Sequence, residues 1–246
     1  MANLKINLEE IKGKLYEKLK PSGWGDPLKT FIMSADMDKI LQALMKDAQD
    51  GKRFTPVLKQ VFRAFEECPY NQLKVVMIGK DPYPYAPKEE GQLPIADGIA
   101  FSCSNSNRIE TALKFIYMEV NDTVYPGQEY IWEPDLKHWS NQGMLIINSS
   151  FTTNLSEVGK HEEIWKPFMA FLLDTLSFHN HGLIYVFMGK KAQEWDDSVP
   201  DNANWKLFCS HPATAAYEKK EHWDSGNIFT KVSHLVFDNY KDKIKW

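Results

Sequence analysis

Short apolar runs in the last two thirds of the chain constrain its fold more than any other feature of the sequence. After Pro69 these runs are rich in β-branched and aromatic residues, and they lack the apolar–polar alternation of a strand exposed on one face. Such runs are typical of strands buried on both faces of a parallel sheet. They predict strands at Leu73–Gly79, Gly98–Ser104, Met144–Asn148, Leu183–Gly189 and Lys206–Ser210.

The segments between these runs have the spacing of helices. Apolar residues recur every three or four positions in Glu110–Asn121 and Ile164–Phe178. Strands that alternate with helices predict an α/β fold with a central, mainly parallel sheet of four or five strands, flanked by helices. We expect the whole chain, residues 1–246, to form a single domain of this kind.

The N-terminal part, residues 1–70, is predicted to be mainly helical and to belong to the same domain. Met37–Asp50 and Val57–Glu67 both place apolar residues at helical spacing. Two polar stretches that contain proline or glycine, Tyr85–Asp97 and Tyr125–Glu133, are predicted to be surface loops and not linkers between domains.

The composition excludes several classes of protein. Of the 246 residues, 43% are hydrophobic and 25% are charged, which is ordinary for a globular chain and unlike a disordered or collagen-like one. No apolar stretch approaches the ~20 residues of a membrane helix, and the N-terminus lacks the apolar core of a secretory signal. The 3 cysteines are widely spaced and fit reduced thiols, so we expect a cytoplasmic protein. The net charge of −4 does not exclude nucleic acid as a partner, because the field at a binding groove is set locally.

Polar and aromatic side chains stand where the predicted strands end. Asp81 and Tyr83 follow the first predicted strand. Asn148 ends the third, His211 follows the fifth, and Phe101 lies within the second. Because ligands of parallel α/β sheets bind outside the carboxyl ends of the strands, we expect these residues to meet in one cleft. Together they suit a flat heterocycle that is stacked, read along its edge and subjected to electrostatic or proton chemistry, although each residue alone also fits a turn or a cap.

Other kinds of site find little support in the sequence. His179 and His181 are close enough to chelate a metal, but no Asp, Glu or Cys stands at ligand spacing from them. The sequence has no phosphate-binding P-loop, no dinucleotide-binding glycine motif after a strand and no nucleophile elbow. We therefore expect neither a metal nor a cofactor.

Five segments carry a resemblance to a known family: Lys74–Tyr83, Gly98–Ser102, Gln142–Thr152, Leu183–Gln193 and Ser210–Thr214. They resemble, in this order, the water-activating motif, the stacking phenylalanine, the uracil-reading strand, the phosphate-holding loop and the minor-groove loop of the uracil-DNA glycosylase family, most closely the family 1 type that excises uracil. Their spacing is nearly that of the family, and weaker similarity covers nearly the whole chain. The resemblance implies a monofunctional DNA repair glycosylase, a hydrolase that cleaves the N-glycosidic bond of deoxyuridine in DNA, releases uracil and leaves an abasic site.

The resemblance also implies a role for each residue of the cleft. Asp81 would orient or activate the attacking water and stabilise the sugar cation, and His211 would donate a hydrogen bond to the departing uracil. Asn148 would read the uracil edge, Phe101 would stack on the flipped base, and Tyr83 would exclude the thymine methyl group. These roles fit the chemistry, since cleavage creates a cationic sugar and an anionic base.

Departures from the family pattern concern DNA binding more than the pocket. Lys80 replaces the usual glutamine and Pro84 the usual histidine. Ala213 replaces a serine, and Ala215 replaces the leucine wedge that fills the gap left by the flipped base, a task that Tyr217 could take over. We therefore expect a stronger preference for single-stranded uracil-DNA than a leucine-bearing relative would show. Lys80 is expected to contact the substrate, and the residues expected to contact DNA are Lys190, Lys191, Ser102, Pro212, Ala213, Thr214, Ala215 and Tyr217.

The implied partner is uracil-containing DNA, single- or double-stranded, and a proteinaceous uracil-glycosylase inhibitor is a second candidate. We expect a monomer that does not bind membranes. Two other functions stay open at this point. One is a DNA- or partner-binding module on the same fold with weak or no excision, and the other is a glycosylase for another modified pyrimidine.

Overall fold

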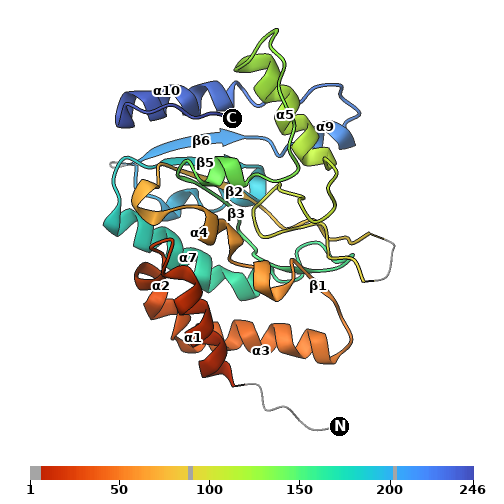
Figure 1. Cartoon of the computed structure of the whole chain (residues 1–246), viewed down its shortest axis with the longest axis vertical. Helices are drawn as coiled ribbons and strands as arrows, with labels where there is room; N and C mark the ends of the chain where they lie inside the picture. Colours follow the sequence, from red (N-terminus) through yellow and green to blue (C-terminus); the bar gives the residue numbers. More distant parts are fainter. Residues whose placement is uncertain (1–6, 88–90, 202–203) are drawn as a thin grey trace.

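A four-stranded parallel sheet lies at the centre of the protein (Figure 1). The computed structural model describes residues 7–87, 91–201 and 204–246. The strands run in the order β3-β2-β5-β6, each parallel to its neighbours. Their bounds are Val75–Gly79 for β2, Met144–Asn148 for β3, Ile184–Met188 for β5 and Trp205–Cys209 for β6. The prediction of an α/β fold with a central parallel sheet is confirmed.

The segment Gly98–Ser104 is not the strand that its apolar run predicts. Gly98 has a φ of +95° and Phe101 a φ of +65°, and neither angle belongs to an extended strand. The segment meets the sheet through a hydrogen bond from the Ala100 N–H to the carbonyl of Ile146 in β3, at 3.0 Å. Its apolar side chains are buried because it folds as a loop against the sheet, so burial without strand geometry explains the wrong prediction.

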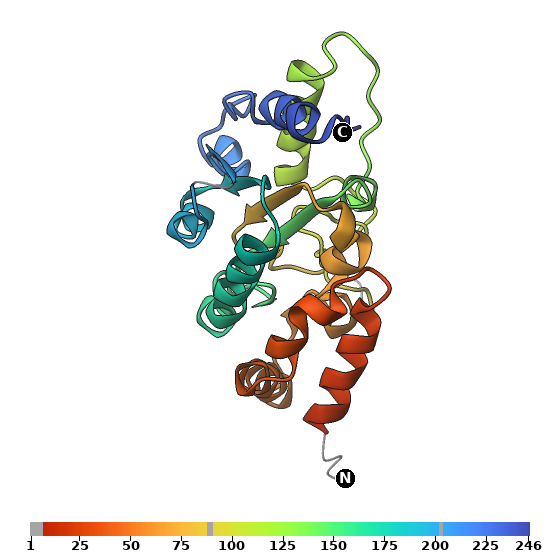
Figure 2. The same cartoon turned by 90° about the vertical axis from the view of Figure 1, so that its left-hand side faces the viewer.

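Helices cover both faces of the sheet (Figures 1 and 2). α5 (Thr111–Thr123) and α10 (Ile228–Tyr240) pack together on one face. α4 (Arg63–Glu67) and α7 (Glu162–His179) lie on the other. α5 and α7 coincide with predicted helices, whereas α10 follows no prediction.

The N-terminal helices form an outer layer beside α7 (Figure 2). α3 is the helix predicted at Met37–Asp50, but the helix predicted at Val57–Glu67 is broken into the short helices η1 and α4. The break lets the carbonyl of Gln60 approach Gly98 closely, since a Cβ at Gly98 would lie 1.8 Å from that oxygen. The remaining elements are α1 (Leu8–Leu19), α2 (Gly25–Ile32), α3 (Ala35–Gln49), η1 (Leu58–Gln60), η2 (Tyr70–Gln72), α6 (Lys137–Ser140), α8 (Lys190–Gln193), η3 (Asp196–Ser198), α9 (Ala213–Tyr217) and the antiparallel pair β1 (Phe54–Thr55) and β4 (Thr153–Asn154).

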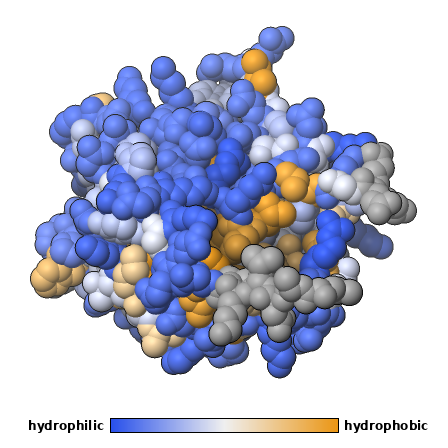
Figure 3. Space-filling model, turned by 60° about the horizontal axis from the view of Figure 1, so that its bottom comes forward, coloured by the Kyte–Doolittle hydropathy of each residue, from blue (hydrophilic) through white to orange (hydrophobic). Residues whose placement is uncertain are grey.

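The two predicted surface loops contain no helix or strand in their described residues. Residues 88–90 of the Tyr85–Asp97 loop lie outside the described part of the chain. Residues 1–6, on which the expectation about a secretory signal depends, lie outside it as well. No described helix is long and apolar enough to cross a membrane. The face in Figure 3 is largely hydrophilic, with a central band of hydrophobic atoms.

A buried polar network fastens α3 to the segment that precedes α7. His161 Nε2 lies 2.9 Å from Asp47 Oδ2, and the Asn154 amide donates to the same oxygen at 2.8 Å. The Thr152 hydroxyl lies 2.8 Å from His161 Nδ1 and accepts a hydrogen bond from the Trp165 indole at 2.7 Å. Because these partners come from distant parts of the sequence, the network fixes the chain between β3 and α7.

We expect Asp47→Ala to lower the free energy of unfolding at pH 7 by about 3 kcal/mol, since it leaves buried polar partners unpaired. Burial opposes ionisation of Asp47, but hydrogen bonds from His161 and Asn154 outweigh it and lower the pKa to about 2. The ionised Asp47 therefore stabilises the folded protein fully above about pH 4, the ordinary pKa of an aspartate in the unfolded chain. This stabilisation is lost as the pH falls toward about 2, the pKa of Asp47 in the folded protein.

Chemical denaturation at pH 7 and pH 3 checks this expectation. The difference in unfolding free energy between Asp47→Ala and the wild type should be smaller at pH 3 than at pH 7. Asp50→Ala, at the exposed C-terminal end of the same helix, is the control and should change stability by less than about 0.5 kcal/mol. Equal unfolding free energies for Asp47→Ala and the wild type at pH 7 would contradict the role of the network.

Candidate active site

The order of the strands places a binding site at the carboxyl edge of the sheet. Along the chain, β2 is followed by β3 on one side and by β5 on the other, so the direction of winding reverses between β2 and β5. Ligands of such sheets bind outside the carboxyl ends of the strands at this point. In β2 and β3 the last residues, Gly79 and Asn148, are paired in register. The chain segments that leave β2 and β3 therefore start side by side at this edge.

A cavity of about 520 Å³ opens at this edge. All five residues that the sequence places in the cleft line it: Asp81, Tyr83, Phe101, Asn148 and His211. The predicted convergence of these residues on one cleft is confirmed. Among the described residues, no three His, Cys, Asp or Glu side chains gather as a metal site requires.

Asp81 is a nearly buried carboxylate with a lysine beside it. Its side chain is 6% exposed, and Lys80 Nζ lies 3.0 Å from Oδ2. Burial raises the pKa of Asp81 above its ordinary value, although the Lys80 ammonium acts in the opposite direction. The carboxylate therefore has little contact with water and faces the cavity with one charged partner.

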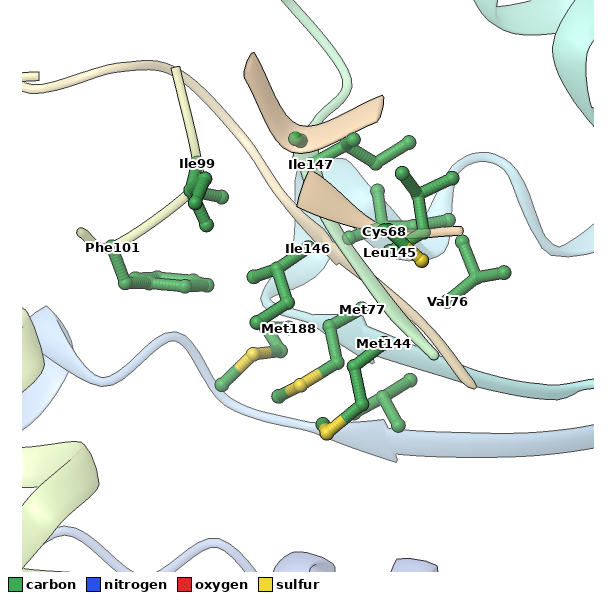
Figure 4. Close-up of a cluster of buried hydrophobic side chains, with 14 of the residues drawn as sticks. Cys68, Val76, Met77, Ile99, Phe101, Met144, Leu145, Ile146, Ile147 and Met188 are labelled. Atoms are coloured by element: carbon green, nitrogen blue, oxygen red, sulfur yellow. The ribbon is translucent and has the colours of Figure 1, made fainter. Parts of the chain in front are cut away.

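Gly79 forms the floor beneath Asn148 and Phe101. A Cβ at Gly79 would lie 2.6 Å from Asn148 Oδ1 and 3.1 Å from the Phe101 ring, so only glycine fits there. No hydrogen-bond partner within the described residues occupies the Asn148 side-chain amide, which is therefore free for a ligand. Figure 4 shows the Phe101 ring at the rim of the buried cluster, directed toward Ile146 and Met188.

The positive φ of Phe101 is held by a buried polar hub around Asp97. The fully buried Asp97 carboxylate accepts hydrogen bonds from the Ile99 N–H and from the Ser102 and Ser104 hydroxyls. It also pairs with Arg63 at 2.9 Å. The Tyr83 hydroxyl donates to the Phe101 carbonyl at 3.0 Å and fixes the same loop from the cavity side.

This hub also involves Ser102, which is expected to contact DNA. Ser102 has no exposed surface, and its hydroxyl donates to Asp97 at 2.6 Å. The hydroxyl is therefore already used inside the protein, and the DNA contact of Ser102 stays a prediction.

His211 is held as a neutral hydrogen-bond donor. The Ala213 N–H donates to His211 Nδ1 at 3.2 Å, so the proton of the neutral ring is on Nε2. Burial, together with the nearby Lys80 ammonium, lowers the pKa of His211 to about 4. Gly189 makes room for the ring, since a Cβ there would lie 2.8 Å from His211 Cβ. The ring centroids of His211 and Phe101 are 5.6 Å apart, so the donor stands beside the stacking surface.

A second cavity, of about 650 Å³, adjoins the first; its lining includes four lysines, with Lys220 among them, and the two acidic residues Glu218 and Asp224. Lys80 and His211 line both cavities, while Lys190 and Lys191 line only the second. Lys191 is paired with Glu162 at 2.9 Å, whereas Lys190 is exposed. This cavity offers cations to an anionic backbone beside the deeper, more apolar pocket.

The predicted minor-groove segment leads into the short helix α9. Ala215 is 2% exposed and Pro212 is also buried, and their contacts with DNA stay predictions. Ala213 and Thr214 are half-buried at the cavity walls. Tyr217 is 85% exposed and lines the first cavity, which leaves it as the side chain of α9 that can act as a wedge.

Sequence reasoning missed three residues that shape this site. Gly79 and Gly189 lie in the predicted motifs, but only their neighbours were singled out there. A glycine at the end of a strand could have indicated that another residue packs closely against the backbone. Glu162, in the first turn of α7, is far from Asp81 in the sequence, and only the folded chain brings it close enough to affect that carboxylate. Nothing in the sequence around Glu162 marks it as part of the site.

Comparison with known proteins supports the relationship that the motifs suggest. Residues 65–233 match the family model of the uracil DNA glycosylase superfamily. A uracil-DNA glycosylase of Acinetobacter baylyi is 25% identical over 97% of this chain and 97% of its own length. One from Amoebophilus asiaticus is 27% identical over 84% of this chain and 89% of its own length. A variant of mimivirus UNG, solved in complex with UGI, superposes with a TM-score of 0.83 at 25% identity, covering 98% of this chain and 91% of that one. Because the family model matches more than half of its residues, this chain belongs to the uracil-DNA glycosylase superfamily.

Proposed function

We propose that this protein is a DNA repair glycosylase that hydrolyses the N-glycosidic bond of deoxyuridine in DNA. It releases uracil and leaves an abasic site. One observation carries the proposal: the Asp81 carboxylate and the neutral His211 donor face one cavity whose walls include Phe101 and Asn148. A binding module would have no use for a buried carboxylate opposite a preorganised donor.

The geometry supports separate roles for the residues that bind the base and for those that stabilise charge. A uracil flipped out of the DNA would stack on Phe101 and present its amide edge to Asn148, with Tyr83 beside its C5. When the bond between the sugar C1′ and the base N1 breaks, the electron pair stays on uracil. The Nε2–H of His211 would stabilise that anion, and the Asp81 carboxylate would stabilise the cationic sugar and orient the water that adds to C1′.

We further propose that uracil-containing DNA is the macromolecular partner and that an inhibitor of the UGI kind binds this protein, since a mimivirus UNG variant was solved in complex with UGI. We also propose that the chain acts in the cytoplasm as a monomer and folds as one domain. Size-exclusion chromatography coupled to light scattering tests the monomer.

Incubation with uracil-containing oligonucleotides, followed by alkaline cleavage of abasic sites, tests the proposed activity. We expect cleavage at uracil in single-stranded and duplex substrates, faster in the single strand, and none in matched cytosine and thymine substrates. Tight DNA binding without cleavage would favour the binding module. Cleavage only at a C5-modified pyrimidine would favour a glycosylase for another base.

The rate of uracil release should fall only on the acid side, and His211 should produce no inflection near neutral pH. Because burial raises the pKa of Asp81, kcat/KM should fall at a higher pH than for an ordinary aspartate as the carboxylate is protonated. His211, with a pKa of about 4, should stay neutral and add no inflection near pH 6.5. Magnetic resonance titration of the His211 ring checks this directly, and a ring pKa near 6.5 would contradict the assignment.

Gly79→Ala should lower kcat/KM for uracil-DNA by about 100-fold, because the new methyl group displaces Asn148 and Phe101 and small misplacements at reacting groups are costly. Gly13→Ala is the matched control, since a Cβ at Gly13 in α1 meets no atom within 4 Å. Steady-state kinetics on a single-stranded substrate measure both variants, and thermal unfolding shows whether they fold. A folded Gly79→Ala variant with wild-type kcat/KM would show that Asn148 and Phe101 do not read the base.

A further inference from the structure

Lys80 stands in a position that conflicts with the task proposed for Asp81. The carboxylate is most useful to a cationic sugar when its charge is not already balanced, yet Lys80 Nζ lies 3.0 Å from Asp81 Oδ2. A cation so close also disfavours positive charge on the sugar. The pair that the structure shows is therefore well suited to the free protein and poorly suited to the reaction.

The surroundings of Lys80 give it an alternative partner. Its side chain is 32% exposed, and it lines both the base pocket and the neighbouring lysine-rich cavity. A flexible lysine at this junction can therefore turn from the carboxylate toward an anion in the second cavity.

The other charged groups near Asp81 do not replace Lys80. Glu162 of α7 is an anion and raises the pKa of Asp81, while its own ion-pair partner is Lys191 of α8. His211, beyond β6, is neutral at pH 7. The backbone N–H of Gly159 lowers the pKa of Asp81 but carries no net charge. Lys80 is thus the cation that balances Asp81 among the described residues.

We propose that Lys80 is a positioning residue that exchanges partners: it pairs with Asp81 in the free protein and with a DNA backbone phosphate once substrate is bound. Because of the exchange, the negative charge of Asp81 is not balanced by Lys80 when the sugar of the substrate lies beside it. The exchange also makes Lys80 a charged phosphate contact, whereas the usual glutamine could offer only a neutral hydrogen bond. This inference rests on the proposed function, because it gives Asp81 its use.

Two measurements on Lys80→Gln, with Lys80→Arg as the charge-conserving variant, test the exchange. The first is the affinity for a single-stranded oligonucleotide with a tetrahydrofuran abasic site, measured at several salt concentrations. Loss of one phosphate contact should make the slope of log affinity against log salt shallower by about 0.7 in Lys80→Gln, and Lys80→Arg should keep the wild-type slope. Lys39→Gln, on the exposed face of α3, is the matched control and should keep it too.

The second measurement is the pH profile of uracil release. The acid limb of kcat/KM reports the free enzyme, and that of kcat reports the enzyme–substrate complex. Lys80→Gln should move the kcat/KM limb to higher pH, because loss of the ammonium raises the pKa values of both Asp81 and His211 in the free enzyme. It should leave the kcat limb nearly in place, because Lys80 has already turned away from both groups in the complex. A merely structural role would move neither limb.

The outcomes separate this inference from the proposed function. An unchanged salt slope, or an unmoved kcat/KM limb, in a folded Lys80→Gln variant overturns the exchange even if the wild type excises uracil. Equal shifts of both limbs overturn it as well, since Lys80 would then stay on Asp81 in the complex. Failure of the wild type to release uracil overturns the proposed function, while the salt slope still decides whether Lys80 contacts phosphate.

Discussion

Asp81→Asn is expected to lower kcat for uracil release by at least about 100-fold while leaving DNA affinity at or above that of the wild type. The carboxylate stabilises charge that develops in the transition state, and loss of such an interaction lowers kcat without a matching loss of ground-state binding. Asparagine keeps the size of the side chain but removes the anion. It also removes the ion-pair partner of Lys80, which is then free for phosphate.

Single-turnover kinetics and DNA-binding measurements on the same preparation check both halves of this expectation. Asp36→Asn, an exposed aspartate in the first turn of α3, is the control and should keep wild-type turnover. A folded Asp81→Asn variant with near-wild-type kcat would show that another group stabilises the sugar.

His211→Leu is expected to slow the chemical step by about 100- to 1000-fold, the usual cost of removing a preorganised donor from a developing anion. Leucine fills similar space beside Phe101 and Gly189 but offers no N–H. The effect should be nearly independent of pH from 6 to 8, because the ring that it replaces does not titrate there.

The exposed His222, half of a surface pair with Asp122, provides the control. His222→Leu should excise uracil at the wild-type rate. Rates for His211→Leu that match the wild type at saturating substrate would contradict the role of Nε2 as the donor to uracil.

Much of the fold could be predicted because a buried parallel strand leaves a strong local pattern. The runs at β2, β3 and β5 are apolar and buried almost throughout, as a central sheet requires. The run at β6 was predicted in the right place, but this strand lies at the edge of the sheet, where Trp205 and Phe208 are exposed, so the expected burial on both faces is wrong there. The same pattern failed at Gly98–Ser104, because burial alone does not distinguish a strand from a loop packed against a sheet. α10 was overlooked even though Ile228, Phe229, Val232 and Val236 mark one buried face.

The candidate site was predictable where it lies at strand ends. Asp81, Asn148 and His211 each stand at or just past such an end, so the topology alone brings them together. Contacts between distant segments were not predictable. The pairing of Asp47 with His161 and of Arg63 with Asp97 depends on packing across many residues, and nothing in the local sequence marks it.

The most direct test of uracil excision by this site is chromatographic detection of free uracil released from a single-stranded deoxyuridine oligonucleotide, with the wild type and Asp81→Asn measured side by side. We expect one free uracil for each abasic site formed by the wild type, an intact DNA backbone before alkali, and release slowed at least about 100-fold in Asp81→Asn. Absence of free uracil from a folded wild-type protein that still binds the oligonucleotide would contradict the proposed activity.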